Sequence, residues 1–190
     1  SKYYKINMSK NLLSTVLNFI KRKKYDDAIN LLENFVKINE NSNFVNRMLG
    51  LIYWNKKQWK KSLLNYQKIS KEEINFEISN NMGVALYKLG KFSEASIKFQ
   101  EAINNNNSYL SAYENFCTTN KLLGNYDLAI KFSVKALSLF PTNNKIKNSL
   151  IDTLNYTQPK NCESLILQAN EQILKLNSEN TNNEYIKIST

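Results

Sequence analysis

The chain repeats a pattern of packing residues about every 34 residues along its length. The stretch 91–103 has the same order of apolar, small and polar residues as the stretch 125–137. A period of this length is typical of stacked supersecondary units, each of which covers the apolar side of its neighbour. The sequence therefore predicts a surface built from repeated units, and it does not predict one closed core with a reaction centre.

Composition excludes several classes of protein. Of the 190 residues, 42% are hydrophobic, which is enough for a continuous core and too many for a disordered chain. No stretch approaches the roughly 18 consecutive apolar residues of a membrane span, so we expect a soluble protein. The segment 1–10 is polar and basic with no apolar region behind it, unlike a secretory signal, and we expect a cytoplasmic protein.

The sequence offers little for catalysis or for metal binding. It has no histidine, which is the side chain most often used for acid–base work near neutral pH and for transition metals. Its two cysteines, Cys117 and Cys162, lack the close spacing of a zinc cluster, and we expect both to be ordinary reduced thiols. We therefore predict no enzymatic activity, no cofactor and no metal site.

The repeated pattern has the features of a helical hairpin. Gly50 and Gly83 lie in the middle of predicted first helices, where glycine costs about 0.5–1 kcal/mol relative to alanine, so we expect close approach of a partner helix there. Gly90 and Gly124 are predicted to form the turns. The second helices carry apolar residues three and four apart and small residues where two helices should cross, namely Ala95, Ala102, Ala129 and Ala136.

These residues resemble the tetratricopeptide repeat family, whose pattern is met most fully by residues 76–109 and 110–143. Residues 9–42 and 43–75 match with losses, since Val16 stands where glycine is usual and Ser62 replaces a helix-crossing alanine. A fifth, degenerate repeat is expected at 144–180, with an N-terminal extension at 1–8 and a polar tail or linker at 181–190. The resemblance implies an all-α fold, a right-handed superhelical α-solenoid whose first helices line a concave groove.

Counting from each repeat start places a mixed aromatic and amide set of side chains in that groove. The candidates are Arg47, Leu51, Trp54, Asn80, Asn81, Val84, Tyr87, Asn115 and Thr118. Asn81 and Asn115 occupy the same repeat position and resemble an asparagine ladder that pairs with the amides of an extended peptide, as in O-linked N-acetylglucosamine transferases. The other interpretation is that these are solvated or capping asparagines in a chain rich in asparagine.

A second device of the family is a carboxylate clamp of Lys, Asn, Asn, Lys and Arg that grips chaperone tails. Laid onto the second to fourth repeats, its positions hold Arg47, Leu51, Asn81, Ser111 and Asn115, which do not supply the charges. The sequence therefore disfavours binding of chaperone tails.

Formal charge is +10, and basic residues gather at the first two predicted turns. We call this set the basic ridge; it consists of Lys21, Arg22, Lys23, Lys24, Lys56, Lys57, Lys60 and Lys61. One interpretation is a solvated edge, and the other is a site for a polyanion or an acidic partner. The solvated edge is the favoured interpretation, and nucleic acid is a disfavoured partner.

Our leading hypothesis is a protein–protein interaction scaffold that holds a peptide or an adjoining domain in the concave groove. The alternative is that the chain is the non-catalytic region of a longer protein, because it begins at Ser1 and similar arrays precede sulfotransferases, glycosyltransferases or 2-oxoglutarate oxygenases. Its partner would then be the catalytic domain of the same chain. The third and weakest hypothesis is polyanion binding through the basic ridge.

Overall fold

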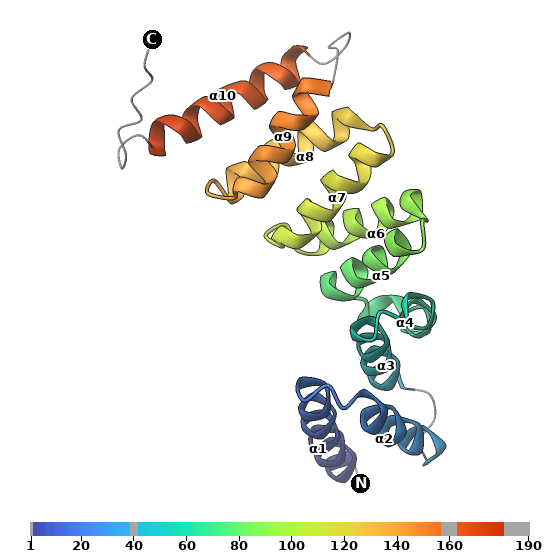
Figure 1. Ribbon diagram of the computed structural model, residues 1–190. Coiled ribbons are helices and arrows are strands. Elements are labelled where there is room, and N and C mark those ends of the chain that lie inside the picture. Colours follow the sequence, from blue (N-terminus) through green and yellow to red (C-terminus); the bar gives the residue numbers. More distant parts are fainter. Residues whose placement is uncertain (1, 39–41, 157–162, 181–190) are drawn as a thin grey trace. The chain divides into compact units, whose positions relative to one another are not determined.

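The computed structural model describes residues 2–38, 42–156 and 163–180, and every regular element in these ranges is helical (Figure 1). The helices are α1 (Lys2–Lys21), α2 (Tyr25–Ile38), α3 (Asn43–Asn55), α4 (Trp59–Tyr66), the short 3₁₀ helix η1 (Lys71–Glu73), α5 (Phe76–Lys88), α6 (Phe92–Asn105), α7 (Leu110–Leu122), α8 (Tyr126–Leu139), α9 (Asn144–Tyr156) and α10 (Glu163–Asn180). The all-α architecture of helical hairpins predicted from the sequence is confirmed.

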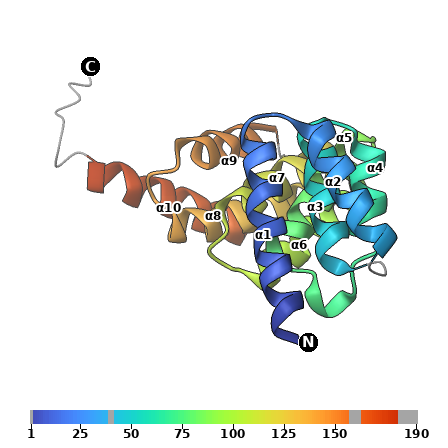
Figure 2. The ribbon, with the colours of Figure 1, turned by 90° about the horizontal axis from the view of Figure 1, so that it is seen from below.

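The chain divides into two compact units, Ser1–Gly90 and Lys91–Thr190, which we call unit 1 and unit 2. In unit 1, α1 packs on α2, α2 on α3, α3 on α4 and α4 on α5. In unit 2, α6 packs on α7, α7 on α8, α8 on α9, and α10 on both α8 and α9. Figures 1 and 2 show α1 and α2 as neighbouring antiparallel helices, the hairpin that recurs along the chain.

Side-chain caps begin three of the first helices. Ser42 accepts a hydrogen bond from the backbone N–H of Val45, and Asn75 accepts one from Ile78. Asn143 does the same for Ile146 at the start of α9, with an oxygen–nitrogen distance of 2.8 Å. Such caps satisfy N–H groups that have no partner inside the helix, so part of the high asparagine content serves helix initiation.

Each described turn between the two helices of a hairpin contains one residue in the left-handed region. These residues are Lys23, Lys57, Gly90 and Gly124, with φ between 57° and 76°. At the turn after α3, the N–H of Lys57 bonds to the carbonyl of Trp54 and the N–H of Gln58 to that of Tyr53, which is the Schellman pattern of helix ends. Glycine adopts this conformation at no steric cost, whereas lysine does not.

Glycine at the middle of α3 permits a very close helix crossing. A methyl group built on Gly50 would lie 2.5 Å from Cε1 of Tyr66, the last residue of α4. Ser62 reinforces the crossing, because its buried hydroxyl donates a 2.8 Å hydrogen bond to the carbonyl oxygen of Gly50. The close approach expected at Gly50 is therefore confirmed, and Ser62 adds a hydrogen bond to the small volume of the alanine it replaces.

The same crossing in unit 2 uses a different pair of residues. Cys117 is the eighth residue of α7, as Gly50 is of α3, and it is hydrogen-bonded to Ser133 of α8. Ser133 occupies the position that corresponds to Tyr66. A larger residue on the first helix is thus matched by a smaller one on the second, which keeps the core close-packed.

The small residues predicted at helix crossings are buried. Ala95, Ala102, Ala129 and Ala136 are each 0% exposed. In the first hairpin, where no glycine is present, Val16 and Leu32 are fully buried in one apolar cluster with Ala28 and Ile52. Each hairpin therefore buries an apolar stripe against its neighbours, as a stacked array requires.

Several segments predicted from the sequence lie at the ends of the chain or outside the described residues. Helix α1 begins at Lys2, within the segment expected to be an extension. The long turn predicted at 157–161, Cys162 and the tail 181–190 lie outside the described residues. Within the described residues, no helix combines the length and the apolar character that crossing a bilayer demands.

Replacing Gly50 by alanine tests the helix crossing. We expect the variant to lose about 1–2 kcal/mol of unfolding free energy, because overpacking costs about 1–3 kcal/mol and exceeds the gain in helix propensity. Urea denaturation followed by circular dichroism measures this loss. Combining Gly50→Ala with Tyr66→Leu should make the two effects less than additive, and full additivity would show that the methyl group does not meet the ring.

Replacing Lys57 by glycine tests the strain in the turn. Relief of the left-handed conformation should stabilise the protein by about 0.5–1 kcal/mol, after subtraction of the entropy that glycine adds to the unfolded chain. Lys57→Ala is the matched control, because it removes the charge and keeps the Cβ atom that causes the strain. Equal effects of the two variants in urea denaturation would contradict the assignment.

Candidate functional site

Three predicted groove residues of α3 share one helix face, since Arg47, Leu51 and Trp54 are spaced four and three apart. Arg47 donates a 3.1 Å hydrogen bond to the backbone carbonyl of Glu73, in η1, which ties α3 to the linker before the next first helix. Trp54 packs edge-to-face on Trp59, with ring centroids 6.0 Å apart. The indole N–H of Trp54 is buried without a hydrogen-bond partner.

Of the four groove residues predicted on α5, one is buried and three are half-buried. Asn80 is only 5% exposed, so it contributes to the core of unit 1 and offers little surface to a ligand. Val84 and Tyr87 are half-buried. Asn81, also half-buried, donates a 3.3 Å hydrogen bond to the hydroxyl of Tyr66, so this amide already has a partner inside the repeat array.

Tyr66 is the buried polar anchor of this region. Its side chain is 1% exposed, and burial raises its pKa from 10.0 to about 12, because the charged phenolate is disfavoured away from water. The hydrogen bond from Asn81 acts in the opposite direction on that pKa. Tyr66 therefore stays protonated in the folded protein throughout the neutral range.

Unit 2 holds the remaining predicted groove residues on α7. Thr118 is exposed and Asn115 is half-buried, with the backbone carbonyl of Asn115 accepting a 2.7 Å hydrogen bond from Thr119. Asn81 belongs to unit 1 and Asn115 to unit 2, and each has contacts within its own unit. A continuous asparagine ladder stays a prediction.

Beside Thr118, sequence reasoning considered Lys145 and Ser149 as positions of a carboxylate clamp and did not predict the contacts that they make with Glu114 and Lys121. The ammonium of Lys145, on α9, lies 2.5 Å from the carboxylate of Glu114, on α7. Lys121 reaches Ser149 across the same helix pair, with nitrogen–oxygen distances of 3.4 Å. A small cavity lies beside them, lined by Glu114, Cys117, Thr118, Lys145, Ile146 and Ser149. The sequence signal for this ion pair is the spacing of Glu114 and Lys145, which have opposite charges and lie 31 residues apart, about one repeat.

The described side chains do not assemble a reactive centre. Burial raises the pKa of the Cys117 thiol to about 11, although its hydrogen bond with Ser133 and the charge of Lys121 lower it in part. A thiol with so high a pKa is a poor nucleophile near neutral pH. Within the described ranges, no group of three or more Cys, Asp or Glu side chains is placed to hold a metal ion.

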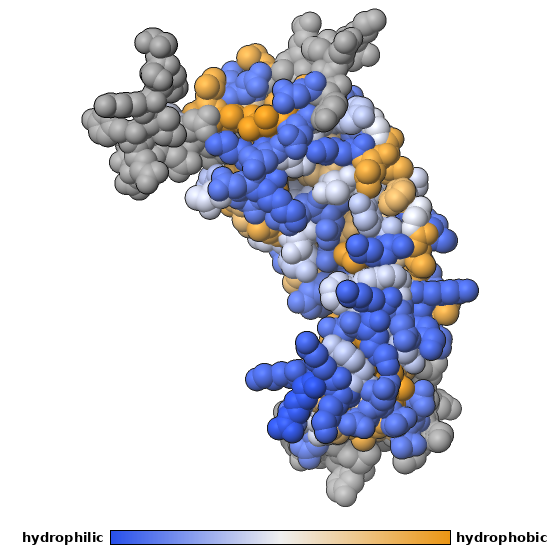
Figure 3. Space-filling model, viewed as in Figure 1, coloured by the Kyte–Doolittle hydropathy of each residue, from blue (hydrophilic) through white to orange (hydrophobic). Residues whose placement is uncertain are grey.

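The residues of the basic ridge all lie in unit 1, in or next to the turns that follow α1 and α3, with Lys21 at the end of α1 and Lys60 and Lys61 at the start of α4. Lys21, Arg22, Lys23 and Lys24 are exposed, and hydrophilic residues gather on the left of unit 1 in Figure 3, where the turn after α1 lies. Lys56 is partly buried and forms a 2.5 Å ion pair with Asp26, which links the two turns. Lys56 is therefore partly neutralised, whereas its neighbours are more accessible.

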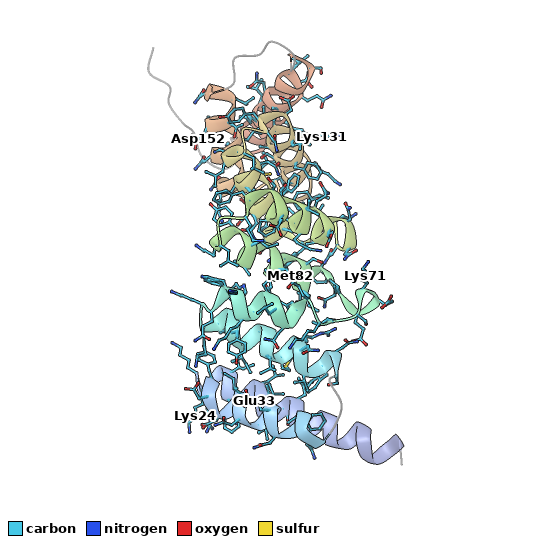
Figure 4. The ribbon with its side chains drawn as sticks, turned by 90° about the vertical axis from the view of Figure 1, so that its right-hand side faces the viewer. Lys24, Glu33, Lys71, Met82, Lys131 and Asp152 are labelled. Atoms are coloured by element: carbon cyan, nitrogen blue, oxygen red, sulfur yellow. The ribbon has the colours of Figure 1, made fainter. Side chains whose placement is uncertain are left out.

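The turns and the linkers of unit 1 lie at opposite edges. In Figure 4, Lys24 of the first turn lies at one edge, and Lys71 of the linker after α4 lies at the other. Met82, in the middle of α5, lies between these edges. The arrangement follows from the hairpins, because every first helix runs from the linker edge to the turn edge.

Comparison with solved structures places this architecture among known folds. The crystal structure of MamA superposes with a TM-score of 0.74 at 17% identity, covering 95% of this chain and 97% of that one. YrrB, a TPR protein with an unusual peptide-binding site, gives a TM-score of 0.71 at 14% identity and covers 90% of each chain. The first TPR of Spaghetti (RPAP3), bound to the HSP90 peptide SRMEEVD, gives 0.54 at 24% identity over 60% of this chain and 90% of that one. No family model and no curated protein matches the sequence.

The raised pKa of Tyr66 predicts a specific loss of stability at high pH. The folded state holds the phenol proton more tightly than the unfolded state, so this contribution is fully present below pH 10 and is lost as the pH rises toward 12. We expect the stability advantage of the natural protein over Tyr66→Phe to shrink by on the order of 2 kcal/mol across this window. Urea denaturation at pH 8 and at pH 11.5 measures it, and a constant difference would contradict the burial of the phenol.

Proposed function

Because the chain has the fold of the tetratricopeptide repeat proteins, we propose that it is a protein–protein interaction scaffold that binds a peptide or an adjoining domain along its first helices. The observation that carries this proposal is the fold itself, in which the first helices α3 and α5 contact each other in unit 1 and α7 and α9 contact each other in unit 2. Two proteins of this fold are peptide binders by description, YrrB and RPAP3.

The chemistry of the first-helix faces also supports a peptide ligand. In unit 1, the half-buried Leu51, Val84 and Tyr87 provide apolar contact area. In unit 2, Asn115 and Thr118 are amide and hydroxyl groups that can donate and accept together. Peptide-binding surfaces combine apolar pockets with polar groups that pair with an extended backbone, and both kinds of group are present here.

The described side chains favour binding over chemical conversion of the ligand. The one described cysteine, Cys117, is buried, and the Glu114 carboxylate beside the unit 2 face is held by Lys145. Arg47 is likewise engaged by the backbone of Glu73. These two charges therefore hold neighbouring elements together, and the other named residues of the first-helix faces are apolar or neutral and polar.

Substitution of the first-helix faces tests the proposal. We expect Tyr87→Ala, Asn115→Ala and Thr118→Ala together to weaken partner binding about tenfold or more, because the variant removes contacts from the first-helix face of each unit and a tenfold loss corresponds to about 1.4 kcal/mol. Partners are first captured from a lysate and identified, and the affinity of each is then measured with purified protein by calorimetry.

The matched control replaces exposed apolar residues of second helices, Leu64→Ala, Ile97→Ala and Leu128→Ala. This triple variant should retain every partner at unchanged affinity. Thermal melts establish that both variants are folded. If the control loses the partners and the first-helix variant keeps them, binding occurs on the second helices and the groove proposal is wrong.

A further inference from the structure

The net positive charge of the protein belongs almost entirely to one unit. Ser1–Gly90 contains sixteen Lys and Arg against seven Asp and Glu, whereas Lys91–Thr190 contains ten against nine. The two units share one fold and nearly one length, so the repeat architecture does not require this difference. The positive charge of unit 1 favours an acidic partner for that unit.

Within unit 1, the charges are further separated between the two edges. Eight of the sixteen cations form the basic ridge at the turns, where the described acidic residues are Asp26 and Asp27 at the start of α2. Glu72 and Glu73 lie in η1 at the linker edge, beside Lys71 (Figure 4). The turn edge is therefore basic on balance, and the linker edge is mixed.

The turn after α3 combines uncompensated lysines with an apolar hollow. An open pocket there is lined by Gln58, Trp59, Lys60, Lys61 and Leu89. None of the ion pairs among the described residues involves Lys57, Lys60 or Lys61. Leu89 is 40% exposed, which is high for a large apolar side chain. We call this hollow the turn pocket.

Contacts inside unit 1 order two residues of the turn pocket, Lys61 and Trp59, and the neighbouring Lys56. Lys61 lies over the ring of Tyr53, with its ammonium 5.3 Å from the ring centroid. Lys56 is fixed by its ion pair with Asp26, and Trp59 by its edge-to-face contact with Trp54. Side chains that are already ordered lose less entropy when a ligand binds, so this arrangement favours binding.

Lys57 contributes a further cation at the same turn, in the left-handed conformation that Lys23 also adopts in the turn after α1. It adopts φ 57°, whereas the equivalent turns after α5 and α7 contain Gly90 and Gly124 in this conformation. A side chain in this region costs about 1–2 kcal/mol. This cost belongs to the geometry of the turn, and Lys57 directly precedes Gln58, which lines the turn pocket.

We propose that the turn pocket binds an acidic peptide segment of a partner protein, with one large apolar side chain of that segment seated between Trp59 and Leu89 and its carboxylates paired with Lys57, Lys60 and Lys61. This site lies at the turn edge of unit 1 and is separate from the first-helix faces described under the proposed function. Either site can therefore fail without the other.

A peptide fits this surface better than a nucleic acid does. Lys60 and Lys61 line the pocket, and Lys57 lies next to its lining residue Gln58 in the chain. An apolar amino-acid side chain matches both Trp59 and Leu89, whereas a nucleobase stacks on the tryptophan ring alone. The ridge cations are seven lysines and one arginine, and arginine is the residue that recognises phosphate and guanine in a bidentate manner. Oligonucleotide binding is nevertheless a distinguishable outcome of the test.

The two tryptophans of the chain both lie at this turn, so their fluorescence reports on the turn pocket directly. The probes are a fluorescein-labelled peptide with six glutamates around one phenylalanine, the same peptide with alanine in place of phenylalanine, and labelled oligothymidylate of equal charge. Anisotropy at 50 mM and 200 mM salt measures affinity, and tryptophan emission of the 190-residue chain is recorded in parallel with unlabelled probes.

We expect the phenylalanine peptide to bind at least tenfold more tightly than the alanine peptide or the oligonucleotide, with a change in tryptophan emission and weaker binding at 200 mM salt. Lys60→Glu with Lys61→Glu should reduce its affinity at least tenfold. Lys68→Glu with Lys71→Glu is the matched control, because it makes the same charge change at exposed positions away from the turn pocket. The control should change the affinity less than threefold.

Three results would overturn the proposal. Equal losses in the two charge-reversal variants would show that net charge alone attracts the peptide. Equal binding of the phenylalanine and alanine peptides, or tighter binding of oligothymidylate, would show a general polyanion surface. Absence of binding by all three probes at 50 mM salt would show a solvated edge. Circular dichroism of each variant confirms that a loss of binding is not a loss of fold.

Discussion

The whole architecture depends on how closely the two helices of one hairpin approach each other. At the crossing of α3 and α4, a glycine carries no side chain, so that the ring of Tyr66 rests on the backbone and Ser62 reaches the carbonyl of Gly50. At the crossing of α7 and α8, Cys117 and Ser133 are hydrogen-bonded to each other. Because each hairpin buries only one stripe by itself, stability comes from stacking, and stacking requires hairpins of similar thickness.

The turns show where sequence freedom remains once that packing is fixed. Each described turn needs one residue at positive φ to end the first helix. That residue is exposed in all four turns. Glycine meets this need without strain at Gly90 and Gly124, whereas Lys23 and Lys57 meet it at a cost in backbone energy. The same turn geometry is thus compatible with an uncharged glycine and with a lysine.

The helical hairpins were predictable, because the order of small and large residues repeats with the period of the packing contacts. The buried alanines and the contact of Gly50 followed from that order. The burial of Asn80 was not predictable from that order. Asn80 is polar and next to a predicted groove residue, and nothing in the sequence indicates that its side chain points into the core. The helix caps at Ser42, Asn75 and Asn143 were also overlooked, because capping asparagines do not stand out in a chain so rich in that residue.

The sequence by itself determined the fold class, the position of the small residues at the crossings, and the gathering of basic residues at two turns, because these depend on local periodicity and composition. Only the tertiary structure decided which charges remain free. Lys56 and Glu114 are neutralised by partners 30 and 31 residues away, whereas the ion pairs of the described residues leave out Lys57, Lys60 and Lys61. Ion pairing acts over a few ångströms in space, and the distance between two side chains is set by helix packing and not by their separation in the sequence.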